Sequence, residues 1–513
     1  MTASLAAPAL RVPSTWLVAG FLIAAQILWV GASEITNTAL FPDAAEQFIW
    51  SKSIEWGYYK HPPLTTWLFA GAIGVFGPHP WVAGTLSGAC LAATGLVTWA
   101  VARQLVGPRL AFFAVLLWSL QQTFSLRAYL YNHNIPLVLT MALCTWAVIT
   151  ASRQPERLRW WGLTGLAAGL AMLVKYQALL PMVGIAWALW RSGTLARRGA
   201  LRGVAAALAV ALLVFAPHAF WLATHDAPPL QYAANTMESL TPEVRLHQVV
   251  AFTVLQLRTL LPALLCAGLW LAVSRRVAKP AATRLEAPLA AVDNGLPVNE
   301  RRAWLEGLIA VPLLLVVAAC ALGGVHLQGQ WGMQSLQFAS IGIAAWGSKR
   351  TAQLSYAWGT GVAIAVHLIG VSVVIPLGLA HSRSTQESDH SLQYGRAQLI
   401  TNSILADWRK ETHCPLRYVV GDSHLAGLVS AYSGVHPYVL EGGDMRKSPW
   451  IDLEDMRKSG SVHITVTADQ LPTGAIHRPD MTLPPIIWRR PMALIWGIVP
   501  PTVDCKVQPP APR

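Results

Sequence analysis

The sequence predicts an α-helical polytopic membrane protein with about eleven transmembrane helices, followed by a small α/β domain. Of its 513 residues, 54% are hydrophobic and 12% are charged, and the mean hydropathy is +0.43. Soluble domains carry about a quarter charged residues. Long apolar runs alternate with short Arg-rich connectors, as expected where a charge in hydrocarbon costs free energy. The net charge of +13 therefore does not indicate nucleic-acid binding.

Each expected span is an apolar run that approaches the roughly 20 residues needed to cross a bilayer. The runs lie near residues 15–33, 81–102, 109–125, 134–151, 160–174, 176–191, 200–222, 248–273, 304–323, 330–347 and 353–380. The tenth is weakened by Gln330, Gln334 and Gln337. If the apolar stretch 64–76 crossed the membrane, the later Arg-rich connectors would fall on alternating sides. We therefore expect it to form a short helix in the outer interface.

Orientation follows from the positively charged connectors, because Lys and Arg are retained on the cytoplasmic side. These connectors lie around residues 103–109, 153–159, 191–202, 275–302 and 349–350. With an odd number of spans, the N-terminus is then cytoplasmic and the tail is outside. The run from Trp16 to Gly31 begins a span, and no small-residue cleavage site follows it.

The chain divides by composition into residues 1–380, which hold the spans, and residues 381–513. Short β-branched stretches such as 417–420 and 462–466 stand between turns and polar helices in the tail, which indicates an α/β domain. Four of the six cysteines fall inside apolar runs and are expected in the core. Cys414 and Cys505 lie in the tail, where they either form a disulfide or stay free.

The first outer loop, residues 34–80, holds two candidate catalytic carboxylates. If residues 43–55 are helical, Asp43, Glu46 and Gln47 share one face. A carboxylate near a low-dielectric surface can act as a general base on a hydroxyl. The alternative is that Asp43 caps the helix and Glu46 completes a capping box.

The same loop holds candidate binding groups next to a fixed bend. Pro62-Pro63 forces the preceding residue into an extended conformation, so Lys60 and His61 lie where the chain re-enters the interface. Together with Tyr58, these groups could bind a lipid phosphate. Alternatively, they are ordinary side chains that extend toward the interface at a helix end.

Further polar residues are expected at the same depth. Arg258 falls about two turns into the eighth span, where an ionisable residue is a functional hypothesis by itself. Outer turns between spans supply the other candidates, which are Arg127, Tyr131, His133, Asn134, Lys175 and Tyr176. Lys and Arg suit a phosphate group. A structural ion pair with Asp43 or Glu46 is the alternative for each cation.

Several of these residues together resemble the PMT-like glycosyltransferases of the GT-C superfamily, which include protein O-mannosyltransferases and the lipid A aminoarabinose transferase (family 39/83 type). The similarity covers the layout of residues 15–380 and is most specific between residues 43 and 64. The matching elements are Asp43-x-x-Glu46-Gln47, Trp50-Ser51, Gly57-Tyr58-x-x-His61-Pro62-Pro63-Leu64, Asn134-x-Pro136-Leu137 and Gly169-Leu170-x-x-Leu173-x-Lys175-Tyr176.

The resemblance implies a GT-C fold in a bacterial inner membrane, with the tail in the periplasm. It implies inverting transfer of a sugar from a polyprenyl-phosphate donor to a hydroxyl of lipid A, another glycolipid, a polysaccharide or a protein. Asp43 would be the base. His61 matches a cationic position, Asn134 stands where many members have Asp, and Lys175 with Tyr176 would serve the donor.

No cofactor is expected. A divalent metal is not expected either, because only Asp43 and Glu46 are obvious oxygen ligands, fewer than a divalent metal site usually has. The alternative functions are a flippase or transporter of lipid-linked saccharides and a non-catalytic membrane scaffold. The enzyme hypothesis requires that Asp43 and Lys175 face one pocket near the outer headgroups.

Overall fold

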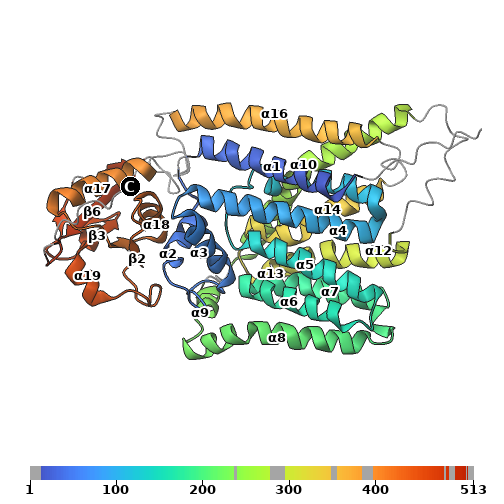
Figure 1. Cartoon of the computed structure of the whole chain (residues 1–513), viewed down its shortest axis with the longest axis horizontal. Helices are drawn as coiled ribbons and strands as arrows, with labels where there is room; N and C mark the ends of the chain where they lie inside the picture. The colour runs from blue at the N-terminus through green and yellow to red at the C-terminus, as the bar shows by residue number, and fades with distance from the viewer. Residues whose placement is uncertain are drawn as a thin grey trace, which may run out of the picture.

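Figure 1 shows a bundle of long helices with a smaller α/β region at one end. This computed structural model describes residues 13–37, 39–235, 240–277, 295–347, 355–383, 397–478, 481–483, 492–503 and 505. The helices of the bundle are α1 (Thr15–Thr36), α2 (Pro42–Trp50), α3 (Leu64–Phe76), α4 (Trp81–Ser119), α5 (Asn134–Arg153), α6 (Leu158–Val174), α7 (Leu179–Arg191), α8 (Ala200–Thr224), α9 (Pro228–Asn235), α10 (Pro242–Val277), α12 (Val298–Leu305), the π-helical turn η4 (Glu306–Ala310), α13 (Val311–Gly323), α14 (Met333–Trp346) and α16 (Tyr356–Arg383).

The predicted membrane fold is confirmed. In the described part of the chain, 7 helices are long and apolar enough to cross a membrane. The remaining expected spans correspond to the second half of α4 and to α6, α7 and α14, which have 17, 13 and 14 residues. The stretch expected to lie in the interface forms α3, with the bounds Leu64–Phe76.

α4 contains two of the expected spans, because the chain reverses inside it. Gly107 has φ 79° and ψ 167°, a conformation that favours glycine, and Pro108 follows it. The two halves then pack against each other, since a Cβ on Gly95 would lie 2.7 Å from the Trp118 ring. The reversal falls inside the Arg103 to Arg109 connector, as the charge pattern predicts.

Several Arg-rich connectors meet at the end of the bundle that lies far from the α/β region (Figure 1). Arg197 donates to the Ser152 carbonyl at 2.9 Å and pairs with Glu300 at 3.0 Å, and the Leu296 amide donates to the Gln104 carbonyl at 3.2 Å. These contacts join four connectors on one side. That this side is cytoplasmic stays a prediction. The connector residues Lys279, Lys349 and Arg350 lie outside the described residues.

The C-terminal region is a mixed sheet with helices, as the tail pattern predicts. Its sheet has the order β2-β1-β3-β6-β4; β1 is parallel to β2 and β3, β6 is antiparallel to β3 and β4, and β5 pairs with β6. Its elements are α17 (Ala397–Glu411), β1 (Tyr418–Gly421), α18 (Ser423–Tyr432), β2 (Tyr438–Glu441), α19 (Leu453–Ser459), β3 (Ser461–Thr465), β4 (Ile476–His477), β5 (Met481–Leu483) and β6 (Met492–Val499). The predicted division between residues 380 and 381 stays a prediction.

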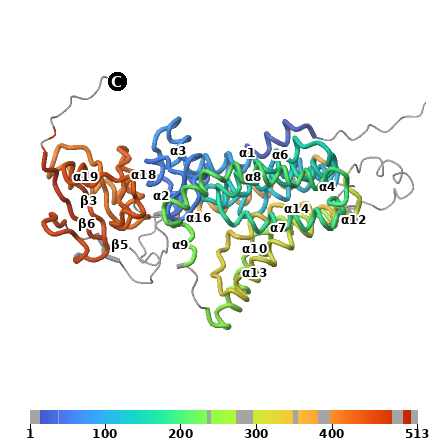
Figure 2. The backbone as a smooth tube through the Cα atoms, turned by 90° about the horizontal axis from the view of Figure 1, so that it is seen from below, coloured from blue at the N-terminus to red at the C-terminus, as the bar shows by residue number. Residues whose placement is uncertain are grey.

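The first outer loop is part of the core of the C-terminal region. Ile49, Trp50 and Tyr58 belong to the same buried apolar cluster as Val419 and Trp496. Both views place α2 beside α18 (Figures 1 and 2). The segment that carries the candidate carboxylates is therefore held between the helical bundle and the C-terminal sheet.

Cys414 and Cys505 form a disulfide with a Cα–Cα distance of 5.2 Å, which decides the alternative left open by the sequence. The four cysteines expected in the core, Cys90, Cys144, Cys266 and Cys320, are buried and free.

We expect Cys505→Ser to lower the free energy of unfolding of the C-terminal region by about 2–4 kcal/mol, because the disulfide closes a long loop. Pulse proteolysis of the full-length protein over a urea series measures this change, with Cys90→Ser as the control. Alkylation of both tail thiols in intact cells without reductant would contradict the disulfide and the outer location.

Candidate functional site

α2 carries both candidate carboxylates, and its start differs from the expected one. Its N-cap is Phe41, with no side-chain capping bond, and Pro42 occupies the first turn. Proline fits there because its missing N–H is not needed. Asp43 thus lies inside the helix, so the capping-box interpretation is wrong. The helix ends at Trp50 and does not reach residue 55.

Glu46 and Lys60 form a largely buried ion pair, with 2.5 Å between Lys60 Nζ and Glu46 Oε1. Burial raises the pKa of Glu46, although Lys60 opposes this effect. Burial pulls the pKa of Lys60 down, but Glu46, together with Glu441 and Tyr232, more than offsets this, so that the pKa is raised. The alternative that the sequence left open for Lys60, a structural ion pair, therefore matches the geometry.

Asp43 lies within the electrostatic reach of Lys175, although the two residues are far apart in the chain. Burial raises the pKa of Asp43, and Lys175 and then Lys60 partly counteract this. Among the described residues, its carboxylate has no ion pair or hydrogen-bond partner. Lys175 therefore acts electrostatically on Asp43, and that both side chains face one pocket stays a prediction.

Lys175 lies in the turn between α6 and α7, where the backbone is extended (φ −164°, ψ 135°). Its Nζ donates to Asn134 Oδ1 at 3.2 Å, and Gln334 Nε2 donates to the same oxygen at 3.5 Å. Burial lowers the pKa of Lys175 to about 8, although Asp43 raises it. This ammonium is therefore charged at neutral pH and loses its proton at moderately alkaline pH.

His61 and His133 are in ring contact, with centroids 3.8 Å apart and planes tilted by 39°, and both rings pack against Trp50. Burial lowers the pKa of both rings well below the ordinary value, and Lys175 and Lys60 add to this. The expected cation at His61 is thus a neutral imidazole at pH 7. In this part of the chain, His133 Nε2 is buried without a hydrogen-bond partner.

Three predicted tyrosines make structural contacts. Tyr58 donates to the Ser53 carbonyl at 2.7 Å and stacks on Trp50. Tyr131 donates to the Thr65 carbonyl at 2.8 Å and is fully buried. Tyr176 bonds His218 Nε2 at 2.7 Å, and His218 Nδ1 in turn lies 2.6 Å from the Trp56 carbonyl. These residues fix the loops around the carboxylates, and their direct contact with a substrate stays a prediction.

The structure does not bring Arg127 and Arg258 into this group. Both side chains are exposed, and neither contributes to the pKa shifts of Asp43, His61 or Lys175. α10 begins at Pro242, so Arg258 lies about 24 Å along this helix, and its depth in the membrane stays a prediction. α10 and α13 also slant away from the main layer of helices (Figure 2).

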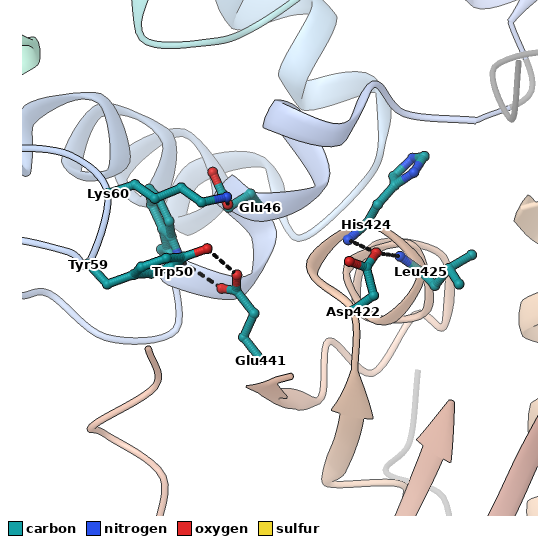
Figure 3. A network of polar contacts seen from close by, with 8 residues as sticks. All are labelled: Glu46, Trp50, Tyr59, Lys60, Asp422, His424, Leu425 and Glu441. Atoms are coloured by element: carbon teal, nitrogen blue, oxygen red, sulfur yellow. Dashed lines mark hydrogen bonds and ion pairs between the residues drawn. The ribbon is translucent and has the colours of Figure 1, made fainter. Parts of the chain in front are cut away.

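The sequence prediction missed one buried carboxylate at the site. Glu441, at the end of β2, accepts a hydrogen bond from Tyr59 Oη at 2.6 Å and one from Trp50 Nε1 at 3.4 Å. Figure 3 shows Tyr59 and Trp50 between Glu441 and the Lys60–Glu46 pair. No local pattern around Glu441 indicates this contact, which forms only when the C-terminal region docks. Gln334 had been noted only as a weakness of its span.

Residues 60–221 match the family model described as dolichyl-phosphate-mannose-protein mannosyltransferase. The fold is similar to that of ArnT from Cupriavidus metallidurans bound to undecaprenyl phosphate, with 17% identity, a TM-score of 0.52, and coverage of 95% of this chain and 98% of the other. The chain therefore shares the fold of ArnT, and its residues 60–221 resemble the mannosyltransferase family. The apo structure of the same ArnT gives a TM-score of 0.53 at 17% identity, with coverage of 94% and 98%.

Two curated proteins from Rhizobium johnstonii are also similar to part of this chain. The lipid A galacturonosyltransferase RgtD is 27% identical over 239 residues, which are 45% of this chain and 49% of the relative. The lipopolysaccharide core galacturonosyltransferase RgtB is 27% identical over 244 residues, with 44% and 45% covered. The chain therefore matches about half the length of these relatives.

The segment that matches the family model, residues 60–221, includes Lys60, His61, Asn134 and Lys175. It begins after Asp43 and Glu46. The geometry therefore joins α2 to this segment independently of the family match. No group of three or more His, Cys, Asp or Glu side chains placed to hold a metal ion occurs in the described ranges. The expectation that the protein uses no cofactor stays a prediction.

Proposed function

We propose that this PMT-like protein is an inverting glycosyltransferase that moves a sugar from a polyprenyl-phosphate donor to a hydroxyl of a glycolipid. The observation that supports the proposal is the electrostatic interaction between the buried Lys175 ammonium and the Asp43 carboxylate, which has no ion-pair partner among the described residues. The carboxylate can accept a proton, and the ammonium can hold a phosphate. The enzymatic names of the relatives support this class of reaction.

Asp43 acts as the general base. It removes the proton of the acceptor hydroxyl while the hydroxyl oxygen attacks the anomeric carbon of the donor sugar. The bond between that carbon and the phosphate oxygen breaks, its electron pair leaves with the polyprenyl phosphate, and the configuration at the carbon inverts. The proton on Asp43 passes to solvent in the next cycle.

Lys175 holds the leaving phosphate. Charge grows on the phosphate as the bond breaks, so a buried ammonium stabilises the transition state more than the bound donor. Asn134 fixes the Lys175 ammonium from one side at 3.2 Å. Two buried nitrogens have no partner in the described structure: Gln47 Nε2 can donate a hydrogen bond to the phosphate or the sugar, and His133 Nε2 can do so in the tautomer that is protonated there.

The site lies at the end of the bundle next to the C-terminal region, opposite the Arg-rich connectors (Figure 1). With those connectors in the cytoplasm, it opens at the outer face of a bacterial inner membrane. A lipid-linked donor then enters from the outer leaflet. The relatives act on lipid A or on the lipopolysaccharide core according to their names, which makes a glycolipid the acceptor to test first.

The test uses purified full-length protein with a panel of polyprenyl-phosphate sugars, including a galacturonosyl donor, and a lipid A acceptor. We expect one donor to give a glycosylated acceptor and free polyprenyl phosphate in equal amounts, with an inverted anomeric centre by NMR. A lipid flippase would move the donor between the leaflets of a vesicle and release no polyprenyl phosphate. That result would refute the enzyme.

A further inference from the structure

The C-terminal region contributes one buried carboxylate to the site. Glu441 is 2% exposed, and its backbone amide is held by Ser448 Oγ at 3.1 Å. One carboxylate oxygen accepts the Tyr59 hydroxyl at 2.6 Å, and the other accepts the Trp50 indole N–H at 3.4 Å. Both oxygens are therefore engaged with the first outer loop.

The two partners of Glu441 lead to two different parts of the site. Tyr59 directly precedes Lys60, which pairs with Glu46 on α2. The Trp50 ring packs against His61 and His133, with centroids 6.4 and 6.0 Å away. A single carboxylate thus contacts, through one side chain each, the segment that carries the ion pair and the ring that packs on the two histidines. Figure 3 shows the hydrogen bonds of Glu441 to Tyr59 and Trp50.

The elements next to Glu441, α18 and β2, pack directly against α2. A Cβ on Gly427 of α18 would lie 2.8 Å from the Ala45 carbonyl oxygen, so the two helices touch backbone to backbone. His436, just before β2, lies 2.8 Å from the Phe48 carbonyl. These contacts hold α18 and β2 at a set distance from the helix that carries Asp43.

We propose that Glu441 is a positioning residue for sugar transfer, through which the C-terminal region holds the loop 58–61 in its reactive arrangement. This inference rests on the proposed function for its kinetic consequence. Glu441 is buried and both of its oxygens bond the first outer loop, so its role is to position other groups. Groups that support reactive side chains in this way commonly change rates when the supporting bonds are lost.

The test variant is Glu441→Gln, which keeps the size of the side chain. An amide has one acceptor oxygen, so it can bond Tyr59 or Trp50 but leaves the other donor facing an N–H group. The matched control is Asp455→Asn, because Tyr418 Oη donates to Asp455 Oδ2 at the same distance of 2.6 Å within the C-terminal region. A further variant, Tyr59→Phe, removes the hydroxyl that donates the shorter of the two hydrogen bonds to Glu441.

Two measurements on full-length protein decide the proposal. We expect amide hydrogen exchange in residues 57–61 to become at least about three-fold faster in Glu441→Gln. The exchange rates of strands β1 to β3 should not change. The control variant should exchange at the wild-type rate in both regions. We expect kcat to fall about ten-fold, with polyprenyl-phosphate binding within two-fold of wild type. Combining Glu441→Gln with Tyr59→Phe should cost little more than either change alone.

Unchanged exchange in residues 57–61 overturns the inference, and so does faster exchange spread over the strands, which would indicate a merely structural role. Additive losses of kcat in the double variant also overturn it. The exchange measurement needs no turnover. If wild type transfers no sugar, the proposed function fails, while the exchange result still decides whether Glu441 positions the loop.

Discussion

Asp43→Asn should reduce kcat by about 10²- to 10⁴-fold, because the amide cannot accept the proton of the acceptor hydroxyl. Binding of polyprenyl phosphate should be unchanged or tighter, since the substitution removes a negative charge from the neighbourhood of Lys175. Single-turnover transfer from a preloaded donor measures the chemical step, and calorimetry with polyprenyl phosphate measures binding. Turnover within three-fold of wild type would remove Asp43 from the mechanism.

Glu46→Gln is the matched control on the same helix, one turn further along. Its carboxylate is bonded to Lys60, so we expect a different kind of damage. Breaking a buried pair leaves a charge uncompensated, and the protein should lose about 3 kcal/mol of stability. The kcat of the molecules that remain folded should fall less than in Asp43→Asn. The reverse order of the two losses in kcat would assign the base to Glu46.

Much of the membrane fold is predictable because hydropathy and charge are properties of local sequence. The bounds of α3 and the reversal at Gly107 follow from an apolar stretch and a charged connector. The side on which a loop emerges follows from counting spans, which brings Asp43 and Lys175 to one end without any contact being known. The start of a helix is harder to predict, because polar residues can extend it beyond the apolar run: α10 begins six residues before the run expected at 248.

Contacts within the site depend on tertiary packing that no local pattern encodes. Asp43 fits a capping motif, but Pro42 takes the first turn and moves the cap to Phe41. Lys60 has the chemistry of a phosphate ligand, but the neighbouring Glu46 binds it. Glu441 is 391 residues from Trp50, so only the docking of the C-terminal sheet brings the two together.

Lys175 should set the alkaline limb of the pH dependence. Phosphate binding requires the charged ammonium, and burial lowers its pKa to about 8, so kcat/KM for the donor should fall as the pH rises through that value. Asp43 must be ionised to act as the base, and burial raises its pKa, so the rate should also fall as the pH drops through this raised value. A bell-shaped profile results, and kcat/KM reports it for the free enzyme.

Substitutions separate the two cations of the site. Lys175→Arg should retain activity and lose the alkaline limb near pH 8, because guanidinium stays charged. Lys175→Gln should lower kcat/KM by about 10- to 100-fold at all pH values, since a hydrogen bond to a charged group is lost. Lys60→Arg is the control: Glu46 raises the pKa of Lys60, so this lysine does not titrate near 8 and the limb should persist. If the limb persists in Lys175→Arg and vanishes in Lys60→Arg, the phosphate is held by Lys60, and the Glu46 pair must open when the donor binds.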